Sequence, residues 1–152
     1  MGADALAARL ETMPGRLASA LAQEASRLGD ELRAAVERNL SGGVLQQRSG
    51  RLAASIDVAV EQNGGAVSTT LGSDVPYAAI HEYGGVIPAH QILPKSARAL
   101  AFPWQGGERF ARRVEMPPVR MPERSFLRSA LTEMEPQIRA AMADAASRAV
   151  SA

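Results

Sequence analysis

The chain has 152 residues, 46% of them hydrophobic and 22% charged, and its formal net charge at pH 7 is +1, values typical of one globular domain. It contains no cysteine, which excludes disulfides and thiolate metal sites, and it has no apolar run long enough to span a membrane. Because the N-terminus also lacks the basic-then-apolar layout of a signal peptide, we expect a protein made in a reducing cytoplasm, or packed into a particle assembled there.

The first predicted element is a helix over residues 1–40. Apolar residues recur at three- and four-residue steps from Leu6 to Leu40, and arginine, glutamate and aspartate fill the other face. Pro14-Gly15 is expected to break this helix into a short and a longer piece, and Ser41-Gly42-Gly43 is expected to end it. Since the polar face carries acidic residues as well as arginines, packing in the core or against another subunit is favoured over binding to a membrane surface.

A β-hairpin is predicted over residues 52–72. Apolar residues alternate with other residues in 56–60 and again in 67–71, and Asn63-Gly64-Gly65 separates the two runs. Alternation with a period of two is typical of strands that bury one face. We therefore expect a hairpin with one face against the core.

A short helix is predicted next, over residues 75–84. Asp74 is suited to cap it and Pro76 to stand in its first turn, while Gly84-Gly85 is suited to end it. The helix would carry Tyr77, Ile80 and His81.

Residues 86–118 are rich in proline and are predicted to form an arm that contains a second hairpin. In this hairpin, residues 99–104 and 109–114 flank the turn sequence at 105–108. Pro103 is expected to keep at least one strand at a sheet edge, because proline cannot donate to a strand ladder. Edge strands are where another subunit can add a strand.

The last predicted element is a helix over residues 122–150. An apolar stripe runs from Phe126 to Ala145, and Pro136 is expected to kink the helix or divide it after about Glu135. The predicted fold class is therefore α+β. It is a single domain in which a small antiparallel sheet of two hairpins packs with a long N-terminal helix and a C-terminal helix.

Catalytic and metal-binding patterns are not found in the sequence. His81 and Glu82 are adjacent, with His90 nine residues further on, but adjacent helix positions point about 100° apart and no third ligand is suitably spaced. The serines lack a nucleophile elbow, and the glycine pairs lack the Gly-Lys-Ser/Thr ending of a phosphate-binding loop. We expect no catalytic residue, metal or cofactor, and a protein that is not an enzyme.

The segment 95–128 is locally basic, with eight Lys/Arg against three Asp/Glu. It can face phosphate or an acidic partner, or it can be a solvated hairpin face. Arg112-Arg113 beside Phe110 and Trp104 is a candidate platform for single-stranded nucleic acid, although anchoring of the hairpin is the favoured role of these aromatics. The basic residues are Lys95, Arg98, Arg109, Arg112, Arg113, Arg120, Arg124 and Arg128.

Three motifs occur in order along the chain. The first runs from Arg48-Ser49-Gly50-Arg51-Leu52 to Ser55-Ile56, and the second from Leu71-Gly72-Ser73 to Glu82-Tyr83-Gly84. The third runs from Pro122 to Leu131 and includes Phe126-Leu127-Arg128. Together they resemble the head–tail joining proteins of long-tailed bacteriophages, a neck or tail-completion family often labelled HK97 gp10-like. The virion-morphogenesis proteins of Mu-like phages are similar in the same middle segment.

This resemblance implies a structural virion protein of a phage, prophage or gene-transfer particle, located at the head–tail interface. The implied partners are other copies of the chain in a six-fold or twelve-fold ring, neighbouring head-closure or connector proteins, and tail-tube or tail-terminator proteins. DNA would pass nearby without sequence-specific contact, and no membrane is involved. Two alternatives stay open: a tail terminator that caps the tail tube, and a cellular binding module of unknown ligand.

Interfaces of such a ring are expected at the edge of the Pro-rich hairpin and along the two long helices. Aromatic side chains supply much of the energy of protein interfaces, and the chain has only six of them. Packing within the chain is the alternative for each candidate. The candidate interface residues are Tyr77, His81, Glu82, Tyr83, Phe102, Trp104, Phe110 and Phe126.

Overall fold

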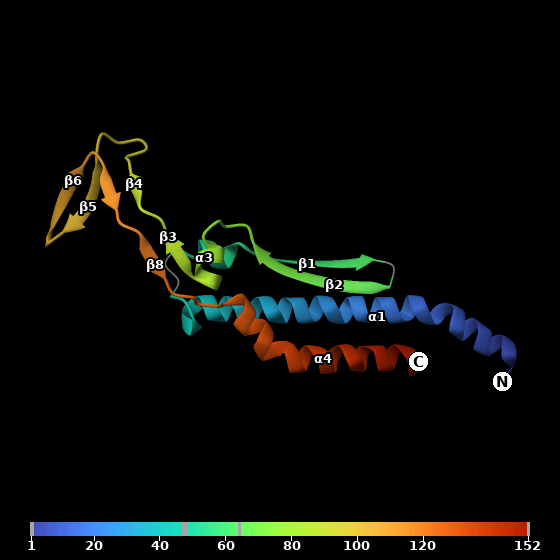
Figure 1. Cartoon of the computed structure of the whole chain (residues 1–152). Coiled ribbons are helices and arrows are strands. Elements are labelled where there is room, and N and C mark those ends of the chain that lie inside the picture. The colour runs from blue at the N-terminus through green and yellow to red at the C-terminus, as the bar shows by residue number, and fades with distance from the viewer. Residues whose placement is uncertain (1, 47–48, 64, 152) are drawn as a thin grey trace.

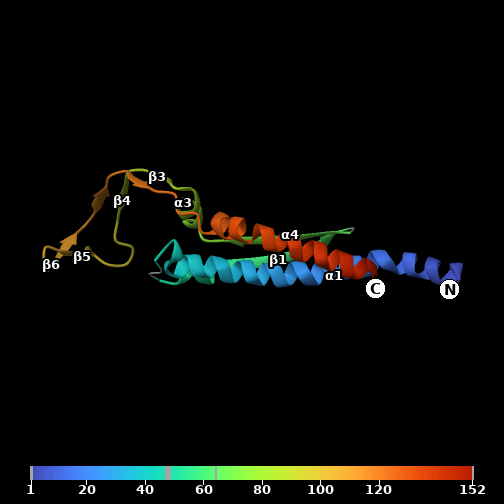
Figure 2. The same ribbon diagram turned by 90° about the horizontal axis from the view of Figure 1, so that it is seen from below.

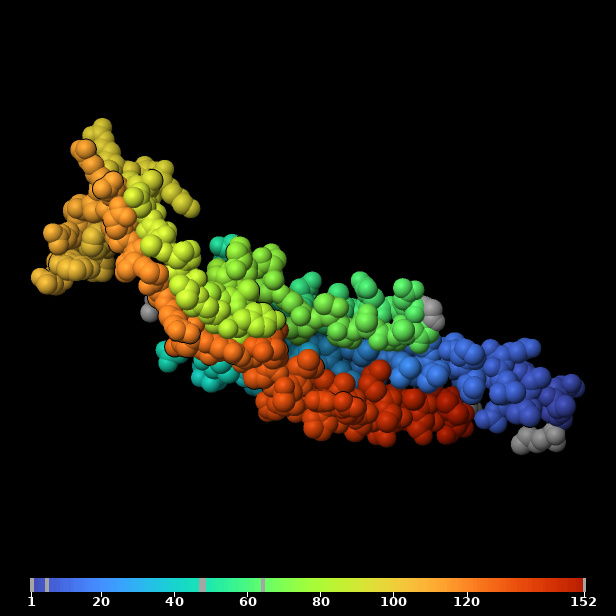
Figure 3. Space-filling model, viewed as in Figure 1, coloured from blue at the N-terminus to red at the C-terminus, as the bar shows by residue number. Residues whose placement is uncertain are grey.

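A computed structural model describes residues 2–46, 49–63 and 65–151 of the chain. The molecule is elongated, with two long helices and one hairpin forming a body and paired strands forming an arm that projects from one end (Figure 1). The space-filling view shows the same arm standing clear of the body (Figure 3). The predicted α+β class is confirmed. Arg48 of the first motif and Gly64 of the predicted turn lie outside the described residues.

Helix α1 spans Ala3–Arg38 without interruption, so the predicted break at Pro14 is wrong. Proline removes one hydrogen bond to the carbonyl four residues earlier, which here belongs to Leu10. Leu10 is exposed, so water can hydrate that carbonyl and the helix continues. The N-terminal end of α1 bends away from the rest of the helix (Figure 1).

The predicted end of this helix is confirmed. A π-helical turn, Asn39–Gly43, follows α1, and Gly42 within it has a φ of 123° that favours glycine. The backbone N–H groups of Val44 and Leu45 both donate to the carbonyl of Asn39, at 2.8 and 2.9 Å. A four-residue helix α2, Arg51–Ala54, then leads into the first strand and was not predicted.

The predicted first hairpin is present, but it begins at Ile56 rather than at residue 52, because residues 51–54 form α2. Strand β1, Ile56–Asn63, pairs antiparallel with β2, Ala66–Ser73. The alternation places Ile56 in the core, where it is buried. Thr69 of β2 donates its hydroxyl to the carbonyl of Ala25 at 3.3 Å. The hairpin therefore packs along α1 through one face.

Close packing of α1 on this hairpin depends on Gly29. A Cβ at this position would stand 2.9 Å from Cγ1 of Val58 and 3.0 Å from Cγ2 of Thr69. Real Cβ contacts are essentially never that short, so the helix and hairpin meet at a distance that only glycine permits.

Helix α3 spans Ala78–Tyr83 and begins later than predicted, so the capping role of Asp74 is wrong. The N-cap residue is Tyr77, which makes no side-chain capping bond. The turn before it is held instead by Ser73, whose hydroxyl accepts the N–H of Val75 at 3.3 Å. The predicted end at Gly84-Gly85 is confirmed, because Gly84 stands at the C-cap with a φ of 67°.

The arm, residues 85–121, is built from three antiparallel strand pairs. The predicted second hairpin is present as the outermost pair, with the shorter turn Gln105-Gly106. Its second strand runs only from Gly107 to Ala111, so residues 112–114 do not belong to it. The two inner pairs were not predicted. Within the described residues each strand pairs with only one other, so the two hairpins do not join into one sheet. The pairs are β3 (Gly85–Ile87) with β8 (Val119–Met121), β4 (His90–Ile92) with β7 (Val114–Met116), and β5 (Leu100–Trp104) with β6 (Gly107–Ala111).

Helix α4 spans Leu127–Ser151, so the predicted start at residue 122 is wrong. Residues 122–126 before it belong to no helix or strand. Pro136 lies inside this helix, so α4 is not divided after Glu135. The axis of α4 changes direction along its length in Figure 1. The helix runs antiparallel beside α1, as the view from below also shows (Figure 2).

The core lies where α1, β1 and the start of α4 meet. Phe126 and Val36 are fully buried, and Ile56 is nearly so. Many of the other core positions are small, because the buried residues of α1 and α4 include several alanines: Ala25, Ala35, Ala130, Ala145 and Ala149. Among the described helices, none is long and apolar enough to cross a lipid bilayer.

Gly29→Leu is expected to lower the free energy of unfolding by about 1–3 kcal/mol, because the added side chain would overpack against Val58 and Thr69. Ser26→Leu adds the same side chain at an exposed position of α1 and is expected to change it by less than about 0.5 kcal/mol. Urea denaturation of both variants measures the difference. Equal effects would contradict the close packing of α1 on the hairpin.

Candidate functional site

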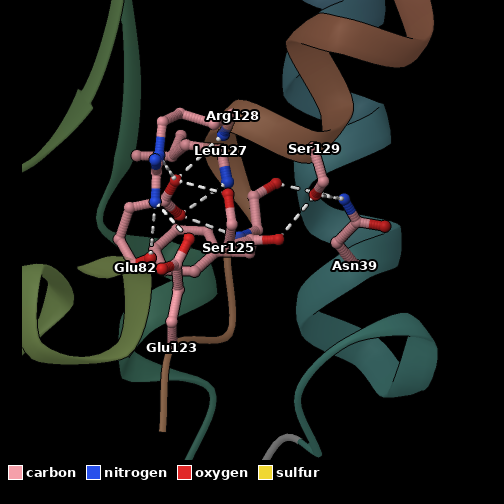
Figure 4. A network of polar contacts seen from close by, with 8 residues as sticks. Asn39, Glu82, Glu123, Ser125, Leu127, Arg128 and Ser129 are labelled. Carbon is pink, nitrogen blue, oxygen red and sulfur yellow. Dashed lines mark hydrogen bonds and ion pairs between the residues drawn. The ribbon is translucent and has the colours of Figure 1, made fainter. Parts of the chain in front are cut away.

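The most connected polar group is the carboxylate of Glu82, which is only 2% exposed (Figure 4). Its Oε2 accepts the backbone N–H groups of Phe126 and Leu127, at 2.8 and 2.9 Å. Its Oε1 accepts the N–H of Arg128 at 3.0 Å and the hydroxyl of Ser125 at 2.7 Å. These are the first N–H groups of α4, which have no partner within the helix. Glu82 therefore caps α4 from another element, and we call this arrangement the Glu82 cap.

The Glu82 cap holds its carboxylate ionised. Burial alone would raise the pKa of Glu82, but hydrogen bonds from the N–H of Leu127, the hydroxyl of Ser125 and the N–H groups of Arg128 and Phe126 outweigh it. Together they lower the pKa from the ordinary 4.5 to about 2. The positive end of the α4 dipole favours the same charged form.

Arg128 covers the outer side of the cap. Its Nε donates to Oε1 of Glu82 at 3.0 Å, and its Nη2 donates to the carboxylate of Glu123 at 2.7 Å. Its guanidinium also stands 4.7 Å from the ring centre of Tyr83. Arg128 was predicted as part of the basic segment. Its guanidinium instead contacts Glu82, Glu123 and Tyr83 of its own chain.

Two further contacts join the same region. The side-chain amide of Asn39, at the end of α1, donates to the carbonyl of Phe126 at 3.0 Å. A Cβ on Gly84 would stand 2.7 Å from the backbone N of Glu123, so the end of α3 and the strand leading to α4 meet backbone to backbone. The N–H of Arg124 donates to the carbonyl of His81 at 2.9 Å.

The second and third sequence motifs therefore meet in space. Glu82-Tyr83-Gly84 of the second lies against Phe126-Leu127-Arg128 of the third. Sequence reasoning placed Glu82 and Phe126 among interface candidates, and this is corrected here: both are buried inside the chain and cannot present a side chain to a partner. The residue directly before α4 is Phe126, which has no side-chain acceptor, and the nearest capping side chain in the sequence is Ser125. This weak local capping was the signal that a distant group caps α4.

A groove lies between the end of α1, α2, α3 and the base of the arm, with a cavity volume of about 990 Å³. Its apolar wall includes Leu40, Val44 and Leu52, and its rim includes His81 and Arg124. The rings of Tyr77 and His81 meet edge to face there, with centroids 6.1 Å apart. Nδ1 of His81 is buried without a hydrogen-bond partner among the residues that the structure describes.

The histidines do not form a metal site. His81 lies at the groove, whereas His90 lies on β4 of the arm, where its Nδ1 is 3.0 Å from the carbonyl oxygen of Pro88. In the described part of the chain there is no group of three or more His, Cys, Asp or Glu side chains that could hold a metal ion.

The outermost pair of the arm, β5–β6, carries aromatic side chains on both faces. Directly opposed residues share a face, and successive residues alternate. Because Phe102 pairs with Arg109, the face with Phe102 and Trp104 is separate from that of Phe110, which pairs with Ala101. Trp104 is 52% and Phe110 64% exposed. We call this pair, residues 100–111, the tip hairpin.

Apart from Arg128, the basic residues of the segment 95–128 lie on the arm and on the stretch between the arm and α4, and two of those on the arm have contacts within the chain. The Arg109 guanidinium stands 5.7 Å from the ring centre of Trp104, and Arg113 pairs with Glu115 at 3.6 Å. Two of the positive charges on the arm are therefore engaged within the chain, one with an aromatic ring and one with a carboxylate. The remaining members are exposed: Lys95, Arg98, Arg112, Arg120 and Arg124.

Comparison with protein families found one match. The family model of the phage virion morphogenesis family matches residues 22–151. Comparisons with curated proteins and with solved structures found no significant match. The matched range begins within α1 and takes in the hairpin, the arm and all of α4.

Glu82→Gln is expected to lower the free energy of unfolding by about 3 kcal/mol, because an amide has one acceptor oxygen where two are used and leaves buried N–H groups unsatisfied. The matched control is Glu123→Gln, whose exposed pair with Arg128 is expected to contribute less than about 1 kcal/mol. Chemical denaturation at neutral pH compares them. A Glu82→Gln loss no larger than that of the control would show that the cap is dispensable.

The depressed pKa of Glu82 also sets a pH dependence. A carboxylate with a lower pKa in the folded chain stabilises the fold fully above its unfolded value of 4.5, and this stabilisation is lost as the pH falls toward about 2. The free energy of unfolding is therefore expected to fall between about pH 5 and pH 2, and to fall less steeply in Glu82→Gln. Parallel pH profiles for the two proteins would rule out this assignment.

Proposed function

The chain belongs to the phage virion morphogenesis family, and from this premise we propose that it forms part of the neck ring that joins the DNA-filled head to the tail. The observation that carries the proposal is the arm. It extends from the body (Figure 3). It ends in a hairpin whose aromatic side chains are exposed on both faces.

The tip hairpin is unsuited to stand alone in water. A two-stranded hairpin without further packing is marginally stable, and the substantial contacts of β5 and β6 are those between the two strands. Exposed clusters of large apolar side chains mark interaction sites. Insertion of the tip hairpin between neighbouring protein surfaces would cover both of its faces at once.

The strands of the arm also support assembly through the backbone. Each described strand pairs on one side only, so β5 and β6 both keep an open edge. Open edges accept a strand from another chain by main-chain hydrogen bonding. Proline at position 103 blocks part of one edge, which favours addition on β6.

The proposed role is structural and involves no catalysis or cofactor. Glu82, the most strongly perturbed acid among the described residues, is committed to capping α4 and is closed off from substrate. The proposed partners are other copies of the chain, a head-closure or connector protein on one side, and a tail-tube or tail-terminator protein on the other. The proposed location is the head–tail interface of the virion.

Deletion of the gene from its phage or prophage, followed by electron microscopy, tests this role. We expect DNA-filled heads lying apart from tails of normal length. Overlong tails would assign the chain to tail termination instead. Normally joined particles would overturn the proposal and favour a cellular binding module.

Complementation of the deletion with Trp104→Ser/Phe110→Ser tests the arm itself. Since truncation of a central interface aromatic costs about 2 kcal/mol or more, we expect at least about tenfold fewer joined particles. The purified variant should unfold at the wild-type urea midpoint, because neither ring packs on the core. The control Val150→Ser removes an exposed apolar side chain from α4 and should restore joining. Full joining by the double variant would show that the tip hairpin is not the interface.

A further inference from the structure

The first turns of α1 extend beyond the rest of the body. Helix α4 ends beside Arg16, whose Nη2 donates to the carbonyl of Ala149 at 3.1 Å. Residues 3–15 continue past this point and past the end of the β1–β2 hairpin in both ribbon views (Figures 1 and 2). We call them the α1 overhang, which is about 20 Å long at the rise of an α-helix.

The α1 overhang carries an apolar face that none of the described residues covers. Leu6 and Leu10 are 60% and 55% exposed, and residues four apart lie on the same side of a helix. They continue the stripe that further along α1 places Leu28 and Val36 in the core. The overhang therefore has the pattern of a packed helix without a packing partner.

The groove provides a matching surface at the opposite end of α1. Its described lining holds apolar side chains, among them Leu40, Val44 and Leu52, and its volume is enough for several leucine-sized groups. Val44 is exposed. Among the described residues, the groove is therefore an open surface with apolar side chains on its wall, and the overhang has no apolar surface packed against it.

Charge favours the same match. The overhang carries Asp4 and Glu11 against Arg9. The described lining of the groove contains Arg124 and His81 but no acidic residue. Pairing two overhangs would bring their acidic residues together, whereas placing an overhang in a groove brings them near Arg124.

We propose that copies of this chain associate head to tail, with the α1 overhang of one copy seated in the groove of the next. The two surfaces are different and lie at opposite ends of one helix, so the contact is heterologous. Such contacts repeat from copy to copy and close into a ring when the rotation permits. This proposal rests on the ring-forming role proposed above and names the surfaces that would form the ring.

Cysteine cross-linking tests the contact directly, because the chain has no cysteine of its own. Leu10→Cys marks the overhang and Val44→Cys marks the groove. The two purified full-length variants are mixed and treated with a short bis-maleimide, which tolerates an uncertain register. Denaturing gels then report covalent dimers. Ala140→Cys, on the exposed side of α4, replaces either partner as the control.

A head-to-tail contact predicts a dimer in the Leu10→Cys and Val44→Cys mixture, none from either variant alone, and a ladder from the double variant. Adding Arg124→Glu to the groove partner should reduce the dimer yield about tenfold, the effect of losing about 1.4 kcal/mol. A dimer from Leu10→Cys alone would assign the overhang to a symmetric pair. A mixture that cross-links no better than the Ala140→Cys control would overturn the contact.

The two proposals fail separately. Separated heads and tails without the cross-link would leave the neck role standing and remove this interface. The cross-link with normally joined particles in the gene deletion would keep the interface and remove the neck role.

Discussion

The fold depends on one buried ion, the carboxylate of Glu82. It binds the first N–H groups of α4, a helix that begins more than forty residues later in the chain. An ionised group so deeply buried is stable only when its charge is met by several donors at once. The donors come from the turn that leads out of the arm, whereas Glu82 itself stands just before the arm begins. One carboxylate thus fixes the start of α4 and both ends of the arm.

In the rest of the body, the helices and the β1–β2 hairpin pack closely through small residues rather than through large side chains. Buried alanines occur in both α1 and α4, and Gly29 lets α1 approach the hairpin. Phe126 is the one fully buried aromatic side chain among the described residues, and its backbone N–H is also one of those that Glu82 binds. The hydrophobic core and the cap therefore share a residue, so a change in either one disturbs the other. The remaining aromatics are left for the surface.

The regular parts of this fold could be predicted because their periodicity is local. The long helices and the β1–β2 hairpin each repeat their pattern over many residues, and the ends at Gly42 and Gly84 follow from backbone freedom. The break expected at Pro14 was wrong, and α4 is not divided at Pro136. Both prolines lie at exposed positions, where the carbonyl left unpaired can bind water. The β3–β8 and β4–β7 pairs are three residues long and join distant segments, which no local pattern indicates. Glu82 was singled out, but its partners lie on another element, so its role required the three-dimensional structure.

The arrangement at the base of the arm has a mechanical consequence. Strands β3 and β8 enter the body side by side. Strand β3 follows α3, which carries Glu82, and β8 precedes by a few residues the N–H groups that Glu82 binds. A pull on the tip hairpin is therefore divided between two strands and reaches α3 and α4 at the same point. The several short bonds of one carboxylate would bear that load together, in place of a single bond that could open first. Because Glu82 joins α3 to the start of α4 at the base of the arm, movement of the tip hairpin would move these two helix ends together.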